Sequence, residues 1–150
     1  MKNGPSKVSD REIVIMRIFD APRELVFNAW IDPAHLGNWW GPNGFTCTFQ
    51  EFDPRPGGVW RFIMHGPDGT DYPNRIIYGE IKRPERIVFH HVLGNYFQVT
   101  ANFEEISGKT RLTMQMLFDS AEECDRIKAF AVDGNRQTMS RLEAYLHKLA

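Results

Sequence analysis

The sequence predicts an α+β fold in which a curved antiparallel sheet covers a long helix at the end of the chain. Between residues 45 and 118, runs with an apolar residue at every second position are separated by short turns. Such runs predict consecutive antiparallel strands. From residue 120 onwards apolar residues recur at steps of three and four, which predicts one apolar face on a helix. Helices set apart from the strands are typical of the α+β class.

Composition favours one ordinary globular domain. The 150 residues include 42% hydrophobic and 25% charged residues, with a formal net charge of −1. That charge creates no field to attract nucleic acid or an anionic membrane surface. No apolar run approaches the roughly 18 residues of a membrane-spanning helix, and the start of the chain is polar. We therefore expect a flexible segment over residues 1–10, a single cytoplasmic domain over residues 11–150, and neither nucleic acid nor membrane as a partner.

The chain should begin with one strand and two short helices. Residues 11–19 are rich in Ile and Val, and Pro22 suits the first turn of a helix because its missing N–H would be unpaired there. Asp32 followed by Pro33 supplies the cap and the first residue of a second helix. We expect a strand over residues 11–19, a helix over 23–31 and a short helix from 33 to about 40.

Six strands should follow, and the last two form the clearest hairpin, with its turn at Ser107-Gly108-Lys109. Apolar residues of this hairpin should face one another across the pair. They are Phe97, Val99, Ala101 and Phe103 on one strand and Leu112, Met114, Met116 and Phe118 on the other. The six predicted strands cover residues 45–53, 59–65, 75–82, 86–93, 96–106 and 110–118.

The terminal helix should begin at Ser120-Ala121-Glu122-Glu123, which has the Ser-x-x-Glu form of a capping box. Its apolar face comprises Ile127, Phe130, Ala131, Gly134, Thr138, Leu142, Tyr145, Leu146 and Leu149, flanked by Met139, and its other side Arg126, Lys128, Arg136, Arg141, Glu143 and Lys148. One helix over the whole stretch would be about 45 Å long at about 1.5 Å per residue, which exceeds a compact domain of this size. Glycine also weakens a helix by roughly 1 kcal/mol relative to alanine. We therefore expect a kink or break near Asp133-Gly134 and a main helix from about Asn135 to Leu149.

Several motifs together resemble those of a known family. They are Phe19-Asp20-Ala21-Pro22-Arg23-Glu24-Leu25-Val26-Phe27, Trp30-Ile31-Asp32-Pro33, Leu36 to Trp40-Gly41-Pro42, Asp53-Pro54-Arg55-Pro56-Gly57-Gly58, Met64-His65-Gly66-Pro67-Asp68-Gly69, Pro84-Glu85-Arg86-Ile87-Val88-Phe89 and Arg141-Leu142-Glu143-Ala144-Tyr145-Leu146. In this combination the chain is similar to the Hsp90-ATPase-activator-homologue-like family of the START/polyketide-cyclase/birch-pollen-allergen superfamily (SRPBCC). The resemblance implies the helix-grip fold, in which a bent antiparallel sheet of about seven strands wraps round the C-terminal helix and encloses a cavity. The family pattern leads us to expect an aromatic residue at position 135. This chain has Asn135 there instead.

Large apolar side chains on the predicted inner faces are candidates to line such a cavity. They are Trp60, Phe62, Met64, Phe89, Phe97, Phe103, Met114, Met116 and Met139. Methionine adapts to irregular shapes and is common at promiscuous binding surfaces. An apolar pocket with a few polar groups is the usual kind of ligand site. The alternative interpretation is that these residues simply fill the core.

Strand alternation also suggests polar candidates. If the apolar residues two positions before them point inward, His91 and Glu51 do so too, and either could orient a ligand or move a proton. A bulge could instead turn either side chain outward, or a backbone group could satisfy it. Tyr78 is a further ligand candidate, although Tyr78 and Arg75 cannot both face inward on a regular strand, and the choice between them stays open.

Two adjacent tryptophans, Trp39 and Trp40, stand where the second short helix should end. We expect one of them to cap the cavity mouth or meet a partner, and the other to pack the helix pair onto the sheet. The sequence leaves open whether this region or the edge of the sheet forms a homodimer.

No metal site, cofactor or catalytic residue is expected. His90 and His91 are neighbours on a strand and therefore point to opposite faces, so they cannot share a metal ion without distortion. Cys47 and Cys124 are too few for a disulfide framework, and Cys47 has no evident basic neighbour to lower its pKa. The chain contains no nucleophile elbow, phosphate-binding loop or dinucleotide-binding motif.

Three functions are therefore compared. The first is a non-enzymatic protein that binds a small apolar, aromatic or lipid-like molecule between the sheet and the C-terminal helix. The second, which the superfamily resemblance implies, is a cyclase- or dehydratase-like enzyme in which His91 or Glu51 acts as general acid or base. The third is a chaperone ATPase co-regulator, which the name of the family suggests. We expect the first, with a small hydrophobic molecule as the partner.

Overall fold

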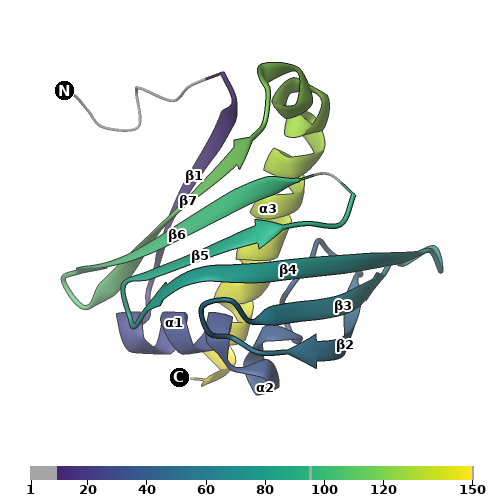
Figure 1. The fold of residues 1–150 in the computed structure, drawn as a ribbon. Coiled ribbons are helices and arrows are strands. Elements are labelled where there is room, and N and C mark those ends of the chain that lie inside the picture. Colours follow the sequence, from purple (N-terminus) through teal and green to yellow (C-terminus); the bar gives the residue numbers. More distant parts are fainter. Residues whose placement is uncertain (1–9, 95, 150) are drawn as a thin grey trace.

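The computed structural model describes residues 10–94 and 96–149, so residues 1–9 of the predicted flexible segment lie outside the described part. One antiparallel sheet of seven strands has the order β1-β7-β6-β5-β4-β3-β2 (Figure 1). The helix α3 (Ala121–Leu149) lies behind this sheet and crosses it from top to bottom of the view. The predicted α+β helix-grip fold is confirmed, with β1 pairing to β7 as well.

The other elements follow the predicted order. They are β1 (Glu12–Phe19), α1 (Arg23–Ile31), α2 (Pro33–Leu36), β2 (Thr46–Phe52), β3 (Val59–His65), β4 (Asp71–Lys82), β5 (Arg86–His91), β6 (Phe97–Ile106) and β7 (Lys109–Phe118). Helix α2 is shorter than expected and ends at Leu36, where the Asn38 side chain donates to the carbonyl of Ala34 at 2.8 Å. Strand β4 begins earlier than expected, because Asp71 pairs with His65 directly across the β3–β4 turn.

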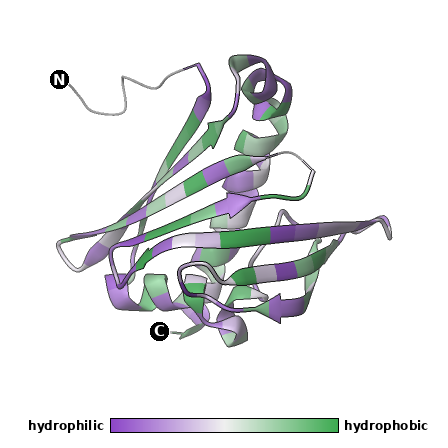
Figure 2. Ribbon diagram, viewed as in Figure 1, coloured by the Kyte–Doolittle hydropathy of each residue, from purple (hydrophilic) through white to green (hydrophobic). Residues whose placement is uncertain are grey.

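The hairpin of β6 and β7 has the predicted register. Phe97 lies opposite Phe118, and Phe103 lies opposite Leu112. The turn is tighter than expected, because Ser107 and Gly108 alone reverse the chain with φ angles of 50° and 83°. Positive φ at both central residues matches the right-handed twist of the strands that the turn joins. Figure 2 shows hydropathy alternating along the strands, as half-buried strands require.

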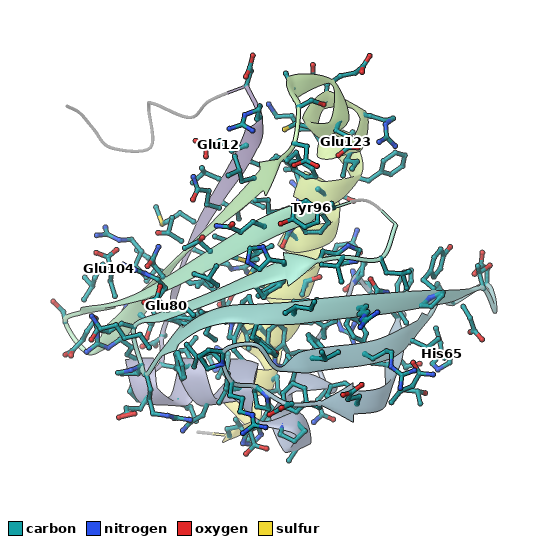
Figure 3. The ribbon with its side chains drawn as sticks, in the orientation of Figure 1. Glu12, His65, Glu80, Tyr96, Glu104 and Glu123 are labelled. Carbon is teal, nitrogen blue, oxygen red and sulfur yellow. The ribbon has the colours of Figure 1, made fainter. Side chains whose placement is uncertain are left out.

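The outward face of the sheet carries charged side chains. Glu80 lies 3.4 Å from Arg86, and Glu104 lies 3.0 Å from Arg111, both as ion pairs (Figure 3). The opposite face and the helices enclose the core, in which Phe19, Phe27, Trp39, Trp60, Phe62, Phe103 and Leu142 are almost fully buried. Within residues 10–94 and 96–149, no helix combines the length and hydrophobicity that crossing a membrane requires.

The prediction of a break in the terminal helix is wrong. Helix α3 runs unbroken for 29 residues and passes straight through Gly134. Side chains support the helix at this point, since Asp133 accepts from Gln137 at 2.9 Å and the Thr138 hydroxyl donates to the carbonyl of Gly134 at 2.9 Å. The Ser120 hydroxyl accepts from the N–H of Glu123 at 3.1 Å, which is one half of the predicted capping box. The Glu123 carboxylate does not complete the box, since its Oε2 lies 3.7 Å from Arg126 and its buried Oε1 has no hydrogen-bond partner within the described residues.

Arginine 141 does not lie on the outward, charged side of α3, where its spacing placed it. The side chain is half-buried, and its Nη1 donates to the carbonyls of Gly41 at 2.8 Å and Pro42 at 2.9 Å. These carbonyls belong to the loop that follows α2, so Arg141 ties α3 to that loop. At the other edge of the sheet, Arg17 of β1 forms a 2.6 Å ion pair with Glu143 of α3.

Replacing Gly134 by alanine should stabilise the protein. Because α3 is helical through Gly134 and an added Cβ would lie 3.7 Å from Pro42 Cγ, an ordinary contact, the free energy of unfolding should rise by about 0.5–1 kcal/mol. Urea denaturation of Gly134→Ala measures this change. Ala129→Gly, at an exposed position of the same helix, is the matched control and should lower stability by a similar amount. A decrease for Gly134→Ala would contradict an unbroken helix.

Candidate cavity between the sheet and the C-terminal helix

A cavity of about 320 Å³ lies between the sheet and α3. All five strands from β3 to β7 contribute side chains to it, as does α3 between Ile127 and Met139. The sheet supplies Phe62, Met64, Asn74, Ile76, Phe89, His91, Phe97, Val99, Met114 and Met116. The helix supplies Ile127, Phe130, Ala131, Gly134, Asn135, Thr138 and Met139, and Trp40, Gly41 and Pro42 close the side next to α2. The space is therefore not filled by the flexible side chains around it.

Most of the predicted cavity residues lie in this lining. They are Trp40, Phe62, Met64, Phe89, His91, Phe97, Met114, Met116 and Met139. Apart from Trp40, which follows α2, they lie on the inward faces of strands or on α3. Whether they contact a ligand stays a prediction.

Four buried aromatic candidates lie outside this lining. Trp60 stacks on Phe62 with ring centroids 4.0 Å apart, on the side of Phe62 that belongs to the core. Tyr78 and Phe103 are also buried away from the cavity, Tyr78 beside Phe52 and Phe89 and Phe103 against Phe27 and Trp30. Trp39 is buried too, and its indole N–H donates to the carbonyl of Ala29 at 3.1 Å. Trp39 therefore packs the helices onto the sheet, whereas Trp40 faces the cavity.

Glutamate 51 does not point into the cavity. A bulge shifts the register of β2 between Phe49 and Glu51, so Glu51 falls opposite Arg61 instead of continuing the inward alternation. The Glu51 side chain is 51% exposed and lies 3.6 Å from Arg61. Arg75 is exposed and Tyr78 is buried, which settles the open choice between them in favour of an inward Tyr78.

Histidine 91 reaches the cavity, as its alternation with Phe89 predicted. Its Nε2 lies 2.7 Å from Oδ1 of Asn74, and its ring stacks on Phe97 with centroids 4.7 Å apart. Nδ2 of Asn74 donates to the carbonyl of Tyr72 at 2.9 Å, so the amide oxygen is the atom turned toward the histidine. The sequence analysis missed Asn74, although Asn74 lies opposite the inward Phe62 in the register of β3 and β4.

The helical wall adds two further polar residues that the sequence analysis did not select. Asn135, where an aromatic residue was expected, fits within α3, and its Nδ2 donates to the carbonyl of Ala131 at 3.0 Å and contacts Sδ of Met116 at 3.4 Å. Thr138 follows one turn later and also lines the cavity. Thr138 belongs to the face that the three- and four-residue spacing identified. Asn135 was not assigned to that face, although it follows Ala131 by four residues.

The rim of the cavity carries an exposed aromatic residue. Phe130 of α3 lines the cavity, yet it is 81% exposed to solvent. On the opposite side, Gly41 has a φ of 104°, and a Cβ at this position would collide with Cε of Met64. The flexible end of Met64 could move aside, but the positive φ is a conformation that other residues rarely adopt, so glycine is favoured at this position.

Cysteine 47 is a poor nucleophile in this environment. Burial raises the pKa of its thiol to about 11, although the charge of Arg141 acts in the opposite direction. The thiol therefore stays protonated at neutral pH. In the part of the chain that the structure describes, no group of three His, Cys, Asp or Glu side chains could hold a metal ion.

A second polar cluster lies on the outward face of the sheet. His65 Nε2 lies 2.7 Å from the Thr48 hydroxyl, and its Nδ1 lies 2.7 Å from Asp71 Oδ1, near the β3–β4 turn (Figure 3). The order hydroxyl, imidazole and carboxylate resembles a hydrolytic triad. All three side chains are at the surface. Their contacts link the neighbouring strands β2, β3 and β4, so a role in stabilising the sheet accounts for them.

Solved structures share this architecture. A protein from Rhodobacter sphaeroides is 25% identical with a TM-score of 0.87, and the alignment covers 98% of this chain and 97% of that one. A protein from Arthrobacter aurescens is 26% identical with a TM-score of 0.85, covering 93% and 87%. The AHSA1 protein from Silicibacter pomeroyi is 22% identical with a TM-score of 0.78, covering 93% and 99%. No curated protein matches the chain.

The sequence also matches a family as a whole. Residues 20–147 match the family described as Activator of Hsp90 ATPase homolog 1-like protein. The matched region begins at the Asp20-Ala21-Pro22 motif and ends within the last turns of α3, so it includes both the sheet and the cavity wall. The resemblance that the motifs indicated is thus confirmed, and the chain belongs to the Activator of Hsp90 ATPase homolog 1-like family.

Proposed function

We propose that this protein binds a small apolar or aromatic molecule in the cavity between the sheet and α3, without catalysis. The observation that carries the proposal is an unfilled space of about 320 Å³ with an almost wholly apolar lining. Ligand sites are typically apolar cavities of about 300–1,000 Å³ with a few polar groups. We further propose a cytoplasmic location, in line with the composition of the chain.

The lining combines fixed and adaptable walls, which supports binding of a molecule rather than a collapsed core. Trp40 is held by edge-to-face contacts with Trp39 and Trp60, with ring centroids 5.5 Å and 5.1 Å apart. Met114 and Met116 lie on the sheet side of the cavity, and their flexible thioethers can adjust to the shape of a guest. Aromatic side chains combined with flexible methionines suit a flat, apolar ligand.

The cyclase- or dehydratase-like alternative has weaker support. His91 lies in the cavity with its Nε2 hydrogen-bonded to Asn74, but Glu51, the other residue proposed for this role, is turned to the opposite face. A chaperone ATPase co-regulator, which the description of the family suggests, would raise the ATPase rate of an Hsp90-type chaperone. If the chaperone rate does not change on addition of this protein, that role is excluded.

Filling the cavity should abolish binding of a neutral aromatic probe. Ala131 lines the cavity on α3, so the ring of Ala131→Phe would occupy the space under the helix. The affinity for N-phenyl-1-naphthylamine, measured by its fluorescence at pH 7, should fall at least tenfold. Ala129→Phe, at an exposed position of the same helix outside the lining, is the matched control and should stay within twofold of the unchanged protein. Equal affinities for the two variants, or no binding to the unchanged protein, would contradict the proposal.

Cysteine 47 should react slowly with alkylating reagents. In a Cys124→Ser background, which leaves Cys47 as the reactive thiol, its rate with iodoacetamide at pH 8 should be about a hundredfold lower in the folded protein than in urea, because burial raises its pKa from 9.0 to about 11. The raised pKa predicts a rate that keeps rising above pH 10. A rate that levels off below pH 9 would reveal a thiolate and reopen nucleophilic catalysis.

A further inference from the structure

The lining of the cavity contains no carboxylate, ammonium or guanidinium group. Its residues include no Asp, Glu, Lys or Arg, and the polar side chains among them are Asn74, His91, Asn135 and Thr138. Arg141 is a nearby cation, but its Nη1 is occupied by the carbonyls of Gly41 and Pro42. An ionised ligand group would therefore lose its water without gaining an opposite charge, which is strongly unfavourable.

Asn135 offers a hydrogen-bond acceptor from the helical wall. Its Nδ2 faces the carbonyl of Ala131 and the thioether of Met116, two groups that can only accept. The orientation of the amide is therefore fixed, and both N–H groups of Asn135 are used. The amide oxygen Oδ1 has no hydrogen-bond partner within the described residues and is left for a ligand in the cavity that Asn135 lines.

Thr138 adds a second acceptor beside the first. Residues three apart on a helix lie on the same face, so Thr138 neighbours Asn135 on the cavity side of α3. The hydroxyl proton of Thr138 is donated to the carbonyl of Gly134 at 2.9 Å, which leaves the oxygen as an acceptor. The helical wall thus presents acceptors and no spare donor from these two side chains.

On the sheet side of the cavity, most hydrogen-bonding groups of the polar side chains already have partners within the sheet. Because Oδ1 of Asn74 faces Nε2 of His91 at 2.7 Å, this nitrogen donates to the amide oxygen. One N–H of Asn74 is used by the carbonyl of Tyr72, which leaves the other as a weak donor from the sheet. A ligand group that mainly donates and can also accept would match both walls, and a hydroxyl group has these properties.

We propose that the ligand is a neutral, mainly apolar molecule with a hydroxyl or phenol group that donates to Asn135 Oδ1 beside Thr138, and that carboxylates are rejected. This inference rests on the proposed function, because it names the class of molecule that the same cavity selects. The hydroxyl hydrogen satisfies the acceptor that the cavity leaves open, and the apolar body contacts Met114, Val99 and Met139.

Three naphthalene probes test the inference by displacement of N-phenyl-1-naphthylamine at pH 7, where 2-naphthol is neutral and 2-naphthoate is ionised. The expected order of affinity is 2-naphthol, then naphthalene, then 2-naphthoate. One buried hydrogen bond should make 2-naphthol about fivefold to tenfold tighter than naphthalene, and 2-naphthoate at least tenfold weaker than naphthalene. Binding of naphthalene with no preference for 2-naphthol, or tighter binding of 2-naphthoate, overturns this inference and leaves the proposed function standing. Binding of none of the three overturns the proposed function itself.

Asn135→Leu assigns the preference to this side chain. Leucine keeps the approximate size of asparagine and removes the acceptor, so the advantage of 2-naphthol over naphthalene should disappear. Retained naphthalene binding shows that the variant is folded with an intact cavity. Thr138→Val, which removes the second acceptor at constant shape, should reduce the same advantage by a smaller factor. An unchanged preference for 2-naphthol in both variants would contradict the assignment.

Discussion

The cavity depends on the uneven way in which α3 packs against the sheet. Leu142 and Leu146 press the C-terminal half of the helix into the core, and the 2.6 Å ion pair between Arg17 and Glu143 fixes that half to β1. The part of the helix from Ile127 to Met139 instead lines the cavity. Because α3 is one unbroken helix, anchoring one half also sets the height of the other half above the sheet. The empty space is therefore a consequence of where the helix is attached.

Trp40 separates this space from the core. Its ring contacts Trp30, Trp39 and Trp60 at 5.1 to 5.6 Å between centroids, in the edge-to-face arrangement that aromatic pairs prefer. Arg141 Nη1 donates to the carbonyls of Trp40, Gly41 and Pro42, so this cation holds the loop beside the cavity and is not part of the cavity lining. The contacts of Arg141 with this loop keep its charge out of the cavity, and the same contacts leave the lining apolar.

Alternation and helical spacing predicted the sheet, its hairpin register and the residues that face inward, because these depend on local periodicity. They could not separate Phe62, which lines the cavity, from Trp60, which packs in the core, since both lie on one face and only the position of α3 distinguishes them. The bulge that turns Glu51 outward is a local shift of one residue, which no period reveals. The break expected in α3 does not occur, because the side-chain hydrogen bonds around Gly134 outweigh the helix-weakening effect of one glycine.

The central claim is that an aromatic guest enters the space beneath α3, and the methionines allow it to be tested directly. Met64, Met114, Met116 and Met139 line the cavity, whereas Met16 is 56% exposed on the outward face of β1. Methyl NMR of the methionine-labelled protein during titration with naphthalene should show shifts at the four cavity methyl groups and none at Met16. Unchanged cavity methyl groups, or shifts at Met16 alone, would contradict the account.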